Sequence, residues 1–354
     1  MNQATIYAAF VILLVHFQGI HARTLLPSSN GIRLRQTQVT PLVKVTDKLV
    51  SAPHLDVIGL PSNPFNELLP LMVYRGGPLI KSPVVSTLAW GSGGNLEVVR
   101  TFPAANSFLA DLPKTTYAEW INKEYSTKKQ VLRGGRLYRE LWLIIDFNAT
   151  VTNKAIQGAI KQLINQKVLL NNVDGNAMTM IFLPPGVSVL FPTDSKCKRD
   201  CIFLTSCLDV CSYHSFFKFN GKNQYYAVIP DLDCANIKNA MDCKQGLPLL
   251  DATTNAISRE YFSMKTNPDG GFGATNQEAT NPDGSFVTTG LGWVDDKYQI
   301  GLQDITDPCP NETDRIKGPS GITWTVQQIW SNKYNACLTS PTRPHLINGT
   351  FANS

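Results

Sequence analysis

The sequence predicts an α/β fold, with α+β as the alternative, in a single globular domain over residues 69–337. Three observations support this prediction. Strand-like apolar runs alternate with helical patterns, one segment repeats apolar residues with a period of 3.6, and all eight cysteines lie in the C-terminal half. The hydrophobic fraction of 43% is ordinary for a globular protein.

The first ordered elements are expected after residue 68. Leu71–Tyr74 and Val84–Trp90 have strand-like composition and flank a tight turn at Arg75–Pro78. We then expect a helix over Tyr117–Tyr125 and a buried strand over Leu141–Phe147.

The middle of the chain carries the clearest helical pattern. Apolar residues recur with helical spacing over Asn153–Leu170, which predicts an amphipathic helix. A strand over Met178–Leu183 follows, and Pro184-Pro185-Gly186 ends it. Ser215–Phe219 and Tyr225–Ile229 are expected to pair across Asn220-Gly221, because Asn-Gly is a strong hairpin turn.

The last predicted helix spans Asp251–Lys265. Asp251 can cap its start, and Asn267-Pro268 stops it. The segment Thr266-Asn-Pro-Asp-Gly270 recurs at 280–284, which most simply makes two turns. A calcium loop is the alternative, although the full spacing of such a loop is missing.

The N-terminus predicts export. Residues 1–22 contain no Lys, Arg, Asp or Glu and include an apolar core over Ile6–Phe17. This core suits a signal peptide and is short for a membrane span, so we expect cleavage before Arg23; a signal anchor is the alternative. We expect residues 23–68 to form an extended segment and residues 338–354 to form a C-terminal tail. No later segment predicts a membrane span.

The cysteines and sequons indicate the same secreted, extracellular compartment. An even number of cysteines in an exported chain predicts disulfides, and a zinc cluster is the alternative for the closely spaced first four. We expect Cys234 to pair with Cys243 and Cys309 with Cys337, although connectivity cannot be deduced from sequence alone. The eight are Cys197, Cys201, Cys207, Cys211, Cys234, Cys243, Cys309 and Cys337. Sequons predict N-glycosylation at Asn148, Asn311 and Asn348.

The charge pattern limits the classes of partner. The net charge is +5, and basic runs interleaved with aromatic residues are missing, so we expect no nucleic-acid partner. The expected partner is an extracellular protein or polysaccharide.

Several short motifs occur in one order along residues 69–337, and together they resemble the EXORDIUM (phosphate-induced protein) family of secreted proteins, known from plant cell walls. The motifs are Tyr74-Arg-Gly-Gly-Pro-Leu79, Trp90-Gly91, Cys211-Ser-Tyr-His-Ser215, Tyr226-Ala-Val-Ile-Pro230, Ser258–Pro268, Asp304-Ile-Thr-Asp-Pro-Cys309 and Trp330–Cys337. The resemblance implies a zincin-like domain with a mixed sheet. It also implies a role in growth or adhesion at the cell wall.

The family pattern at Ser258–Pro268 resembles a zinc-peptidase helix, in which a His and a carboxylate four residues apart bind one ion and an adjacent Glu activates water. This chain has Arg259 at the His position and Ser263 at the second carboxylate position. Glu260 keeps the water-activating position, and Asp304 stands where the family has Glu. A guanidinium stays protonated and repels a cation.

Only His54, His214 and His345 follow the predicted cleavage point, and His214 is the only central one. We therefore expect a degenerate site without metal or other cofactor, formed by Arg259, Glu260, Ser263, Asp304 and His214, in a non-catalytic extracellular protein. The sequence also predicts that Arg259 pairs with Glu260 or Asp304. The alternative is an extracellular metal-dependent hydrolase that uses Glu260 with an atypical ligand set.

Overall fold

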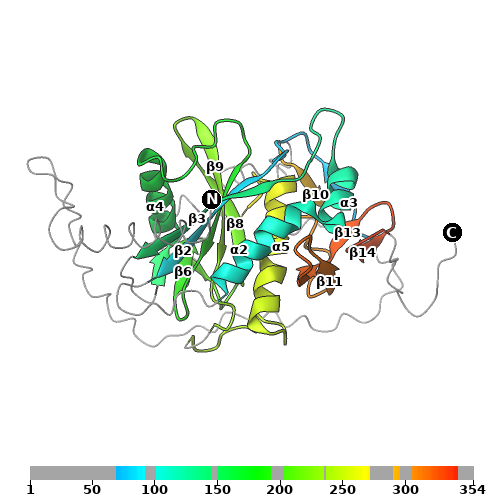
Figure 1. Ribbon diagram of the computed structural model, residues 1–354. Helices are drawn as coiled ribbons and strands as arrows, with labels where there is room; N and C mark the ends of the chain where they lie inside the picture. The colour runs from blue at the N-terminus through cyan, green and yellow to red at the C-terminus, as the bar shows by residue number, and fades with distance from the viewer. Residues whose placement is uncertain are drawn as a thin grey trace, which may run out of the picture. The chain divides into compact units, whose positions relative to one another are not determined.

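A five-stranded mixed sheet lies at the centre of the protein, as the computed structural model shows (Figure 1). The structure describes residues 69–91, 101–144, 150–192, 203–234, 237–271, 290–295 and 304–341. All of them belong to one compact unit, Phe65–Ser354. The predicted signal peptide and N-terminal segment lie outside the described residues, as do Cys197, Cys201, Asn148, Asn348 and the repeat at 280–284.

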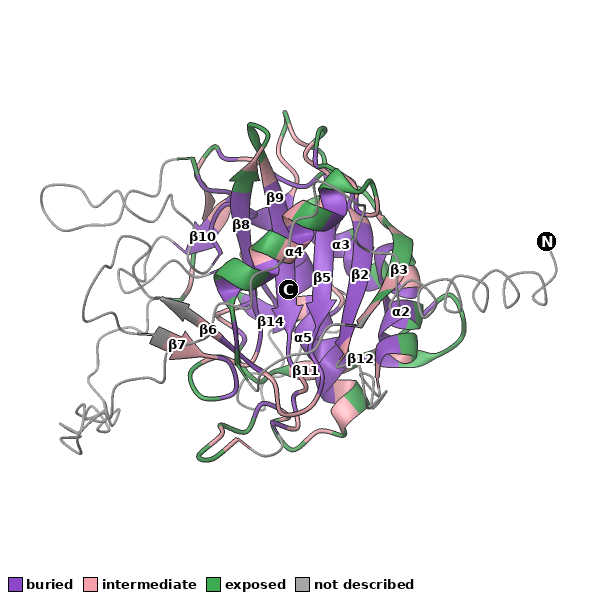
Figure 2. Ribbon diagram, turned by 90° about the vertical axis from the view of Figure 1, so that its left-hand side faces the viewer, coloured by how far each residue is buried: buried purple, intermediate pink, exposed green. Residues whose placement is uncertain are grey.

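The central sheet has the strand order β3-β2-β5-β9-β8. Its first four strands run parallel, and β8 is antiparallel to β9 at one edge. The strands are β2 (Val84–Gly91), β3 (Arg136–Ile144), β5 (Ala177–Phe182), β8 (Tyr213–Phe219) and β9 (Lys222–Ile229). The middle strands are buried on both faces because helices cover both, and their continuous apolar runs reflect this (Figure 2).

Helices on opposite faces of the sheet produce two hydrophobic cores (Figure 1). Alternate strand residues point to opposite faces, so Met180 of β5 joins one core and Ile181 the other. One face is covered by α4 (Asn153–Asn165). The other is covered by α2 (Phe102–Asp111), the short 3-10 helix η1 (Leu112–Lys114), α3 (Thr116–Tyr125) and α5 (Leu249–Thr266).

Smaller sheets surround this centre. The strand pairs β1-β10, β11-β12 and β13-β14 are antiparallel, and a three-stranded sheet has the order β4-β6-β7. The strands are β1 (Met72–Tyr74), β4 (Thr150–Thr152), β6 (Ser188–Pro192), β7 (Phe203–Thr205), β10 (Trp293–Asp295), β11 (Thr313–Lys317), β12 (Thr323–Gln327), β13 (Ile329–Ser331) and β14 (Ala336–Leu338). The predicted α/β class is thus confirmed.

Two predicted elements are wrong in detail. The strand expected to be buried at Leu141–Phe147 overlaps the end of the edge strand β3, which begins at Arg136 and leaves Trp142 38% exposed, while residues 145–147 lie outside the described residues. Asp251 does not cap α5, whose N-cap is Pro248. Instead, Asp251 accepts a hydrogen bond from Thr325 Oγ1 across 2.8 Å, so its carboxylate fixes the helix to β12.

Among the described residues of the C-terminal half, three disulfides are present. The predicted bridge Cys309–Cys337 is confirmed. The predicted pairing of Cys234 with Cys243 is wrong: Cys234 pairs with Cys207, and Cys243 pairs with Cys211. The fold brings the segment after β7 next to the segment after β9. Each of these two bridges therefore joins cysteines from different segments, 27 and 32 residues apart, and Cys234 does not pair with its near neighbour Cys243.

Candidate functional site

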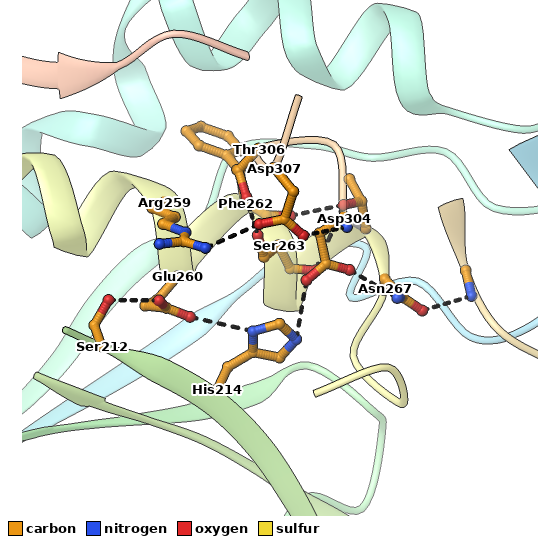
Figure 3. A network of polar contacts seen from close by, with 12 residues as sticks. Ser212, His214, Arg259, Glu260, Phe262, Ser263, Asn267, Asp304, Thr306 and Asp307 are labelled. Atoms are coloured by element: carbon orange, nitrogen blue, oxygen red, sulfur yellow. Dashed lines mark hydrogen bonds and ion pairs between the residues drawn. The ribbon is translucent and has the colours of Figure 1, made fainter. Parts of the chain in front are cut away.

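The candidate site residues predicted from the sequence meet at one end of α5. Three elements supply them: the start of β8, α5 and the turn at residues 304–309 that precedes β11 (Figure 3). Ser212 and His214 are two positions apart in an extended segment, so both side chains point to the same face. Glu260 and Ser263 have helical spacing and share the α5 face that meets them, and Asn267 is the C-cap residue of the same helix.

His214 lies between two carboxylates. Its Nδ1 donates to Glu260 Oε2 across 3.2 Å, and its Nε2 lies 3.7 Å from Asp304 Oδ2. All three residues are buried, with exposed fractions of 5% for His214, 3% for Glu260 and 8% for Asp304. Since each ring nitrogen faces a carboxylate, the imidazolium form is favoured.

Both oxygens of Glu260 are occupied. Ser212 Oγ donates to Oε1 across 2.6 Å, while His214 contacts Oε2. Burial alone would raise the pKa of Glu260, but the hydrogen bond from His214 and the charges of Arg259 and His214 hold this pKa below its usual value. A carboxylate of lowered basicity is poorly suited to take a proton from water.

His214 and Asp304 both bind protons more tightly than their free side chains. Burial lowers the pKa of His214, but the hydrogen bond to Glu260 and the charge of Asp304 outweigh burial and raise it. Burial raises the pKa of Asp304 to about 6, against the opposing charge of His214. Asn267 Nδ2 also donates to Asp304 Oδ1 across 2.7 Å, and this contact favours the ionised carboxylate.

Arg259 has a different partner from the one predicted. Its Nη2 donates to Asp307 Oδ1 across 2.9 Å, so the expected pairing with Glu260 or Asp304 is wrong. Asp307 Oδ2 in turn accepts from the backbone N–H of Asp304 across 2.7 Å. The guanidinium therefore binds the turn that carries Asp304, and His214 takes the position that Arg259 was expected to fill.

The remaining predicted ligand position is also engaged. Ser263 Oγ lies 2.8 Å from Thr306 Oγ1, within a buried hydroxyl pair. Gly271 closes the site from the segment after α5, because an added Cβ would lie 2.2 Å from the carbonyl oxygen of His214. The site is thus packed by its own chain on several sides.

Sequence reasoning missed four participants: Ser212, Asn267, Thr306 and Asp307 as the partner of Arg259. The two-residue spacing between Ser212 and His214 was a usable signal, since it places both on one strand face. The contacts of Thr306 and Asp307 depend on how the turn meets α5, which no local pattern reports.

The donor set does not fit zinc. A zinc site takes about three protein ligands around one point. Here Glu260 contacts Nδ1 of His214 and Asp304 faces Nε2, so the two carboxylates meet different nitrogens of the ring. Within the described ranges, one group of three His, Cys, Asp or Glu side chains has all ligand atoms within 4.8 Å: Cys207, Cys234 and Cys243. All three are in disulfides and offer no thiolate.

Comparisons of the chain with family models, with curated proteins and with solved structures found no match. Among the described helices, none combines the length and apolar character needed to cross a membrane.

Proposed function

We propose that this chain is a non-catalytic, disulfide-bonded extracellular protein, related to the EXORDIUM family and zincin-like in fold, in which an internal ion network replaces the zinc-peptidase site. One observation carries the proposal: His214 lies buried between Glu260 and Asp304, while Arg259 binds Asp307. The groups that would bind metal or activate water neutralise one another instead.

Burial of the network supports a structural role. Glu260 is 3% exposed and both of its oxygens already accept hydrogen bonds. A general base must reach the proton that it removes, which here would require breaking contacts with Ser212 or His214. An extracellular protein or polysaccharide is the proposed partner class, in keeping with the three disulfides and the modest net charge of +5.

Elemental analysis of the full chain, purified with only trace metals present, tests the proposal. We expect less than stoichiometric zinc and no peptide hydrolysis. The double substitution Arg259→His with Ser263→Glu supplies a positive control, since it restores a His and a carboxylate four residues apart on α5. One zinc per wild-type chain, removed by a chelator together with a hydrolytic activity, would overturn the proposal.

A second candidate, a metal-dependent hydrolase, is favoured by one observation. In the described part of the chain His214 Nε2 has no hydrogen-bond partner, and the 3.7 Å to Asp304 Oδ2 is long for a direct bond. Zinc titration followed by calorimetry distinguishes the candidates. Tight wild-type binding that is lost in both His214→Ala and Asp304→Ala would favour the hydrolase, whereas no binding supports the ion network.

Secretion is tested separately. We expect the exported protein to begin at or near Arg23. Asn311 is exposed and begins a sequon, so we also expect it to carry a glycan that Asn311→Gln removes. Terminal sequencing and intact mass of protein from a eukaryotic secretory host check both; an intact Met1 contradicts the export proposal.

A further inference from the structure

Two disulfides lie close together beside the start of β8. Cys207–Cys234 and Cys211–Cys243 are separate bridges, yet the Sγ atoms of Cys207, Cys234 and Cys243 all lie within 4.8 Å of one another. The Sγ atom of Cys243 therefore lies near both sulfur atoms of the neighbouring bridge, in addition to its bonded partner, the Sγ atom of Cys211. Disulfide exchange requires such an approach, because a thiolate must reach a sulfur of an existing bond.

We propose that these four cysteines form a thiol-responsive relay, in which a small thiol that opens Cys211–Cys243 moves the neighbouring bridge from Cys207–Cys234 to Cys234–Cys243. The relay begins at Cys211, which is half-buried, whereas Cys207, Cys234 and Cys243 are buried. Access for an external thiol therefore favours attack on the sulfur of Cys211.

The exchange balances without an oxidant. The thiolate of the small thiol attacks Cys211 Sγ, forms a mixed disulfide there, and displaces the Cys243 thiolate. That thiolate attacks Cys234 Sγ and forms Cys234–Cys243, while the electron pair of the broken bond leaves on Cys207, which takes up the proton that the small thiol lost. Two disulfide bonds exist before and after; one thiol has been captured at Cys211 and one released at Cys207.

Backbone geometry favours opening of the Cys207–Cys234 bridge. Both ends of the original bridge have left-handed backbone angles, with φ of 70° at Cys207 and 49° at Cys234. Residues other than glycine adopt this region at a cost, and the bridge holds two of them there together. Once the bridge is broken, Cys207 is no longer held in this conformation by a covalent link.

The relay also removes a disulfide that holds one segment of the candidate site in place. Cys211 directly precedes Ser212, whose hydroxyl binds Glu260, and lies three residues before His214. In the native pairing a disulfide fixes this segment to Cys243; in the rearranged form that link is lost. Reducing conditions outside the cell would thus loosen the strand end that supplies two members of the ion network.

Limited reduction tests the relay on the full chain. The protein is treated with glutathione and a chelator, so that metal capture plays no part, quenched with acid over a time course and alkylated. Cleavage before aspartate separates Cys207, Cys211, Cys234 and Cys243, because Asp209, Asp233 and Asp242 lie between them; chymotrypsin divides Cys201 from Cys207 at Phe203. We expect a Cys234–Cys243 peptide, with Cys207 alkylated and Cys211 bound to glutathione, as the main product among opened molecules.

Two variants sharpen the test. Cys211→Ser leaves Cys243 without its partner, so we expect Cys234–Cys243 and a free Cys207 without any added thiol. Cys309→Ser also creates one unpaired cysteine, but away from the cluster, and should leave Cys207–Cys234 and Cys211–Cys243 intact. Circular dichroism verifies that each variant is folded. If Cys211→Ser does not fold, the wild-type time course alone tests the relay.

Two results of the limited reduction would contradict the relay. Persistence of Cys207–Cys234 while Cys243 becomes alkylated would overturn the relay. A bridge from Cys243 to Cys197 or Cys201 would overturn it as well, since the exchange would then follow another route.

Discussion

Arg259 on α5 and Asp307 in the turn at 304–309 form an ion pair in which Nη2 donates to Oδ1 across 2.9 Å. The arginine stands where the proposed relationship to the EXORDIUM family would place a metal-binding histidine. Its contact fixes the turn that carries Asp304, and Asp304 faces His214. The pair therefore connects the outer part of the site to its buried centre.

The first prediction concerns this pair. Arg259→Ala should lower the free energy of unfolding by about 1 kcal/mol, because Asp307 loses its partner while remaining beside Asp304; partial exposure of the pair limits the effect. Arg315→Ala, at an exposed position on β11, should change stability by less than about 0.5 kcal/mol. Urea denaturation of both variants measures the difference, and equal stabilities would contradict the assigned role of the pair.

The second prediction concerns the pH dependence of the free energy of unfolding. The pKa of Asp304 is raised from 3.8 to about 6 by burial, so the folded protein binds this proton more tightly than the unfolded chain. Stability from this group is complete below pH 3.8 and is lost as the pH rises through about 6. The raised pKa of His214 acts in the same direction, while the lowered pKa of Glu260 makes stability fall at more acidic pH.

Wild-type protein should therefore lose up to about 1.4 kcal/mol per pH unit between about pH 4 and 6. Asp304→Asn should flatten this dependence, because the titrating carboxylate is gone. Glu119→Gln is the matched control at an exposed carboxylate whose pKa is lowered, and it should leave the dependence above pH 5 unchanged. A wild-type stability that rises with pH over this range would contradict the prediction.

The third prediction concerns Lys265, a fully buried lysine near the end of α5. Its Nζ donates to Asn122 Oδ1 and, across 2.6 Å, to the carbonyl of Arg133. Burial lowers its pKa from 10.5 to about 7. The unfolded chain therefore binds this proton more tightly, and stability should rise with pH between about 7 and 10 by up to about 1.4 kcal/mol per unit.

Lys265→Met should remove this rise, whereas Lys114→Met, at an exposed lysine, should retain it. Denaturation at pH 7 and pH 9 compares the slopes. A slope that persists in Lys265→Met would show that another group titrates in this range.

The fourth prediction concerns Cys309–Cys337, which links residues 28 positions apart. Replacing both cysteines with alanine should lower the free energy of unfolding by about 3–4 kcal/mol, chiefly because the unfolded chain gains freedom. Thermal and urea unfolding of the double variant measure this loss. A loss below about 1 kcal/mol would indicate that contacts around β13 and β14 hold this region without the bridge.

Local patterns predicted the elements whose contacts are themselves local. The β8-β9 hairpin follows from Asn220-Gly221, and α4 follows from its apolar period, although the helix ends at Asn165 instead of Leu170. The position of Leu141 in an edge strand could not be predicted, since sheet order depends on distant pairing.

The central residues of the site were predictable, but their contacts were not. His214, Glu260 and Asp304 were all singled out, but their meeting depends on how α5 packs against β8 and the turn at 304–309. The pairing of Cys207 with Cys234 likewise depends on loops that only the tertiary structure brings together. The contact of Arg259 with Asp307 depends in the same way on the tertiary structure, because it requires the turn at 304–309 to lie against α5.

The hairpin that carries His214 has a consequence for the order of folding. The strands β8 and β9 pair around a two-residue turn, so they can form within about 1–10 μs. Pairing of β2 with β5 must instead bring Val84 to Ala177, which is slower because a long loop has to close first. We expect the histidine to be presented on a finished hairpin before α5 and the turn at 304–309 supply its carboxylates. Neutralisation of the buried charges would then be among the last events of folding, and a chain that stalls earlier would hold His214 open to water.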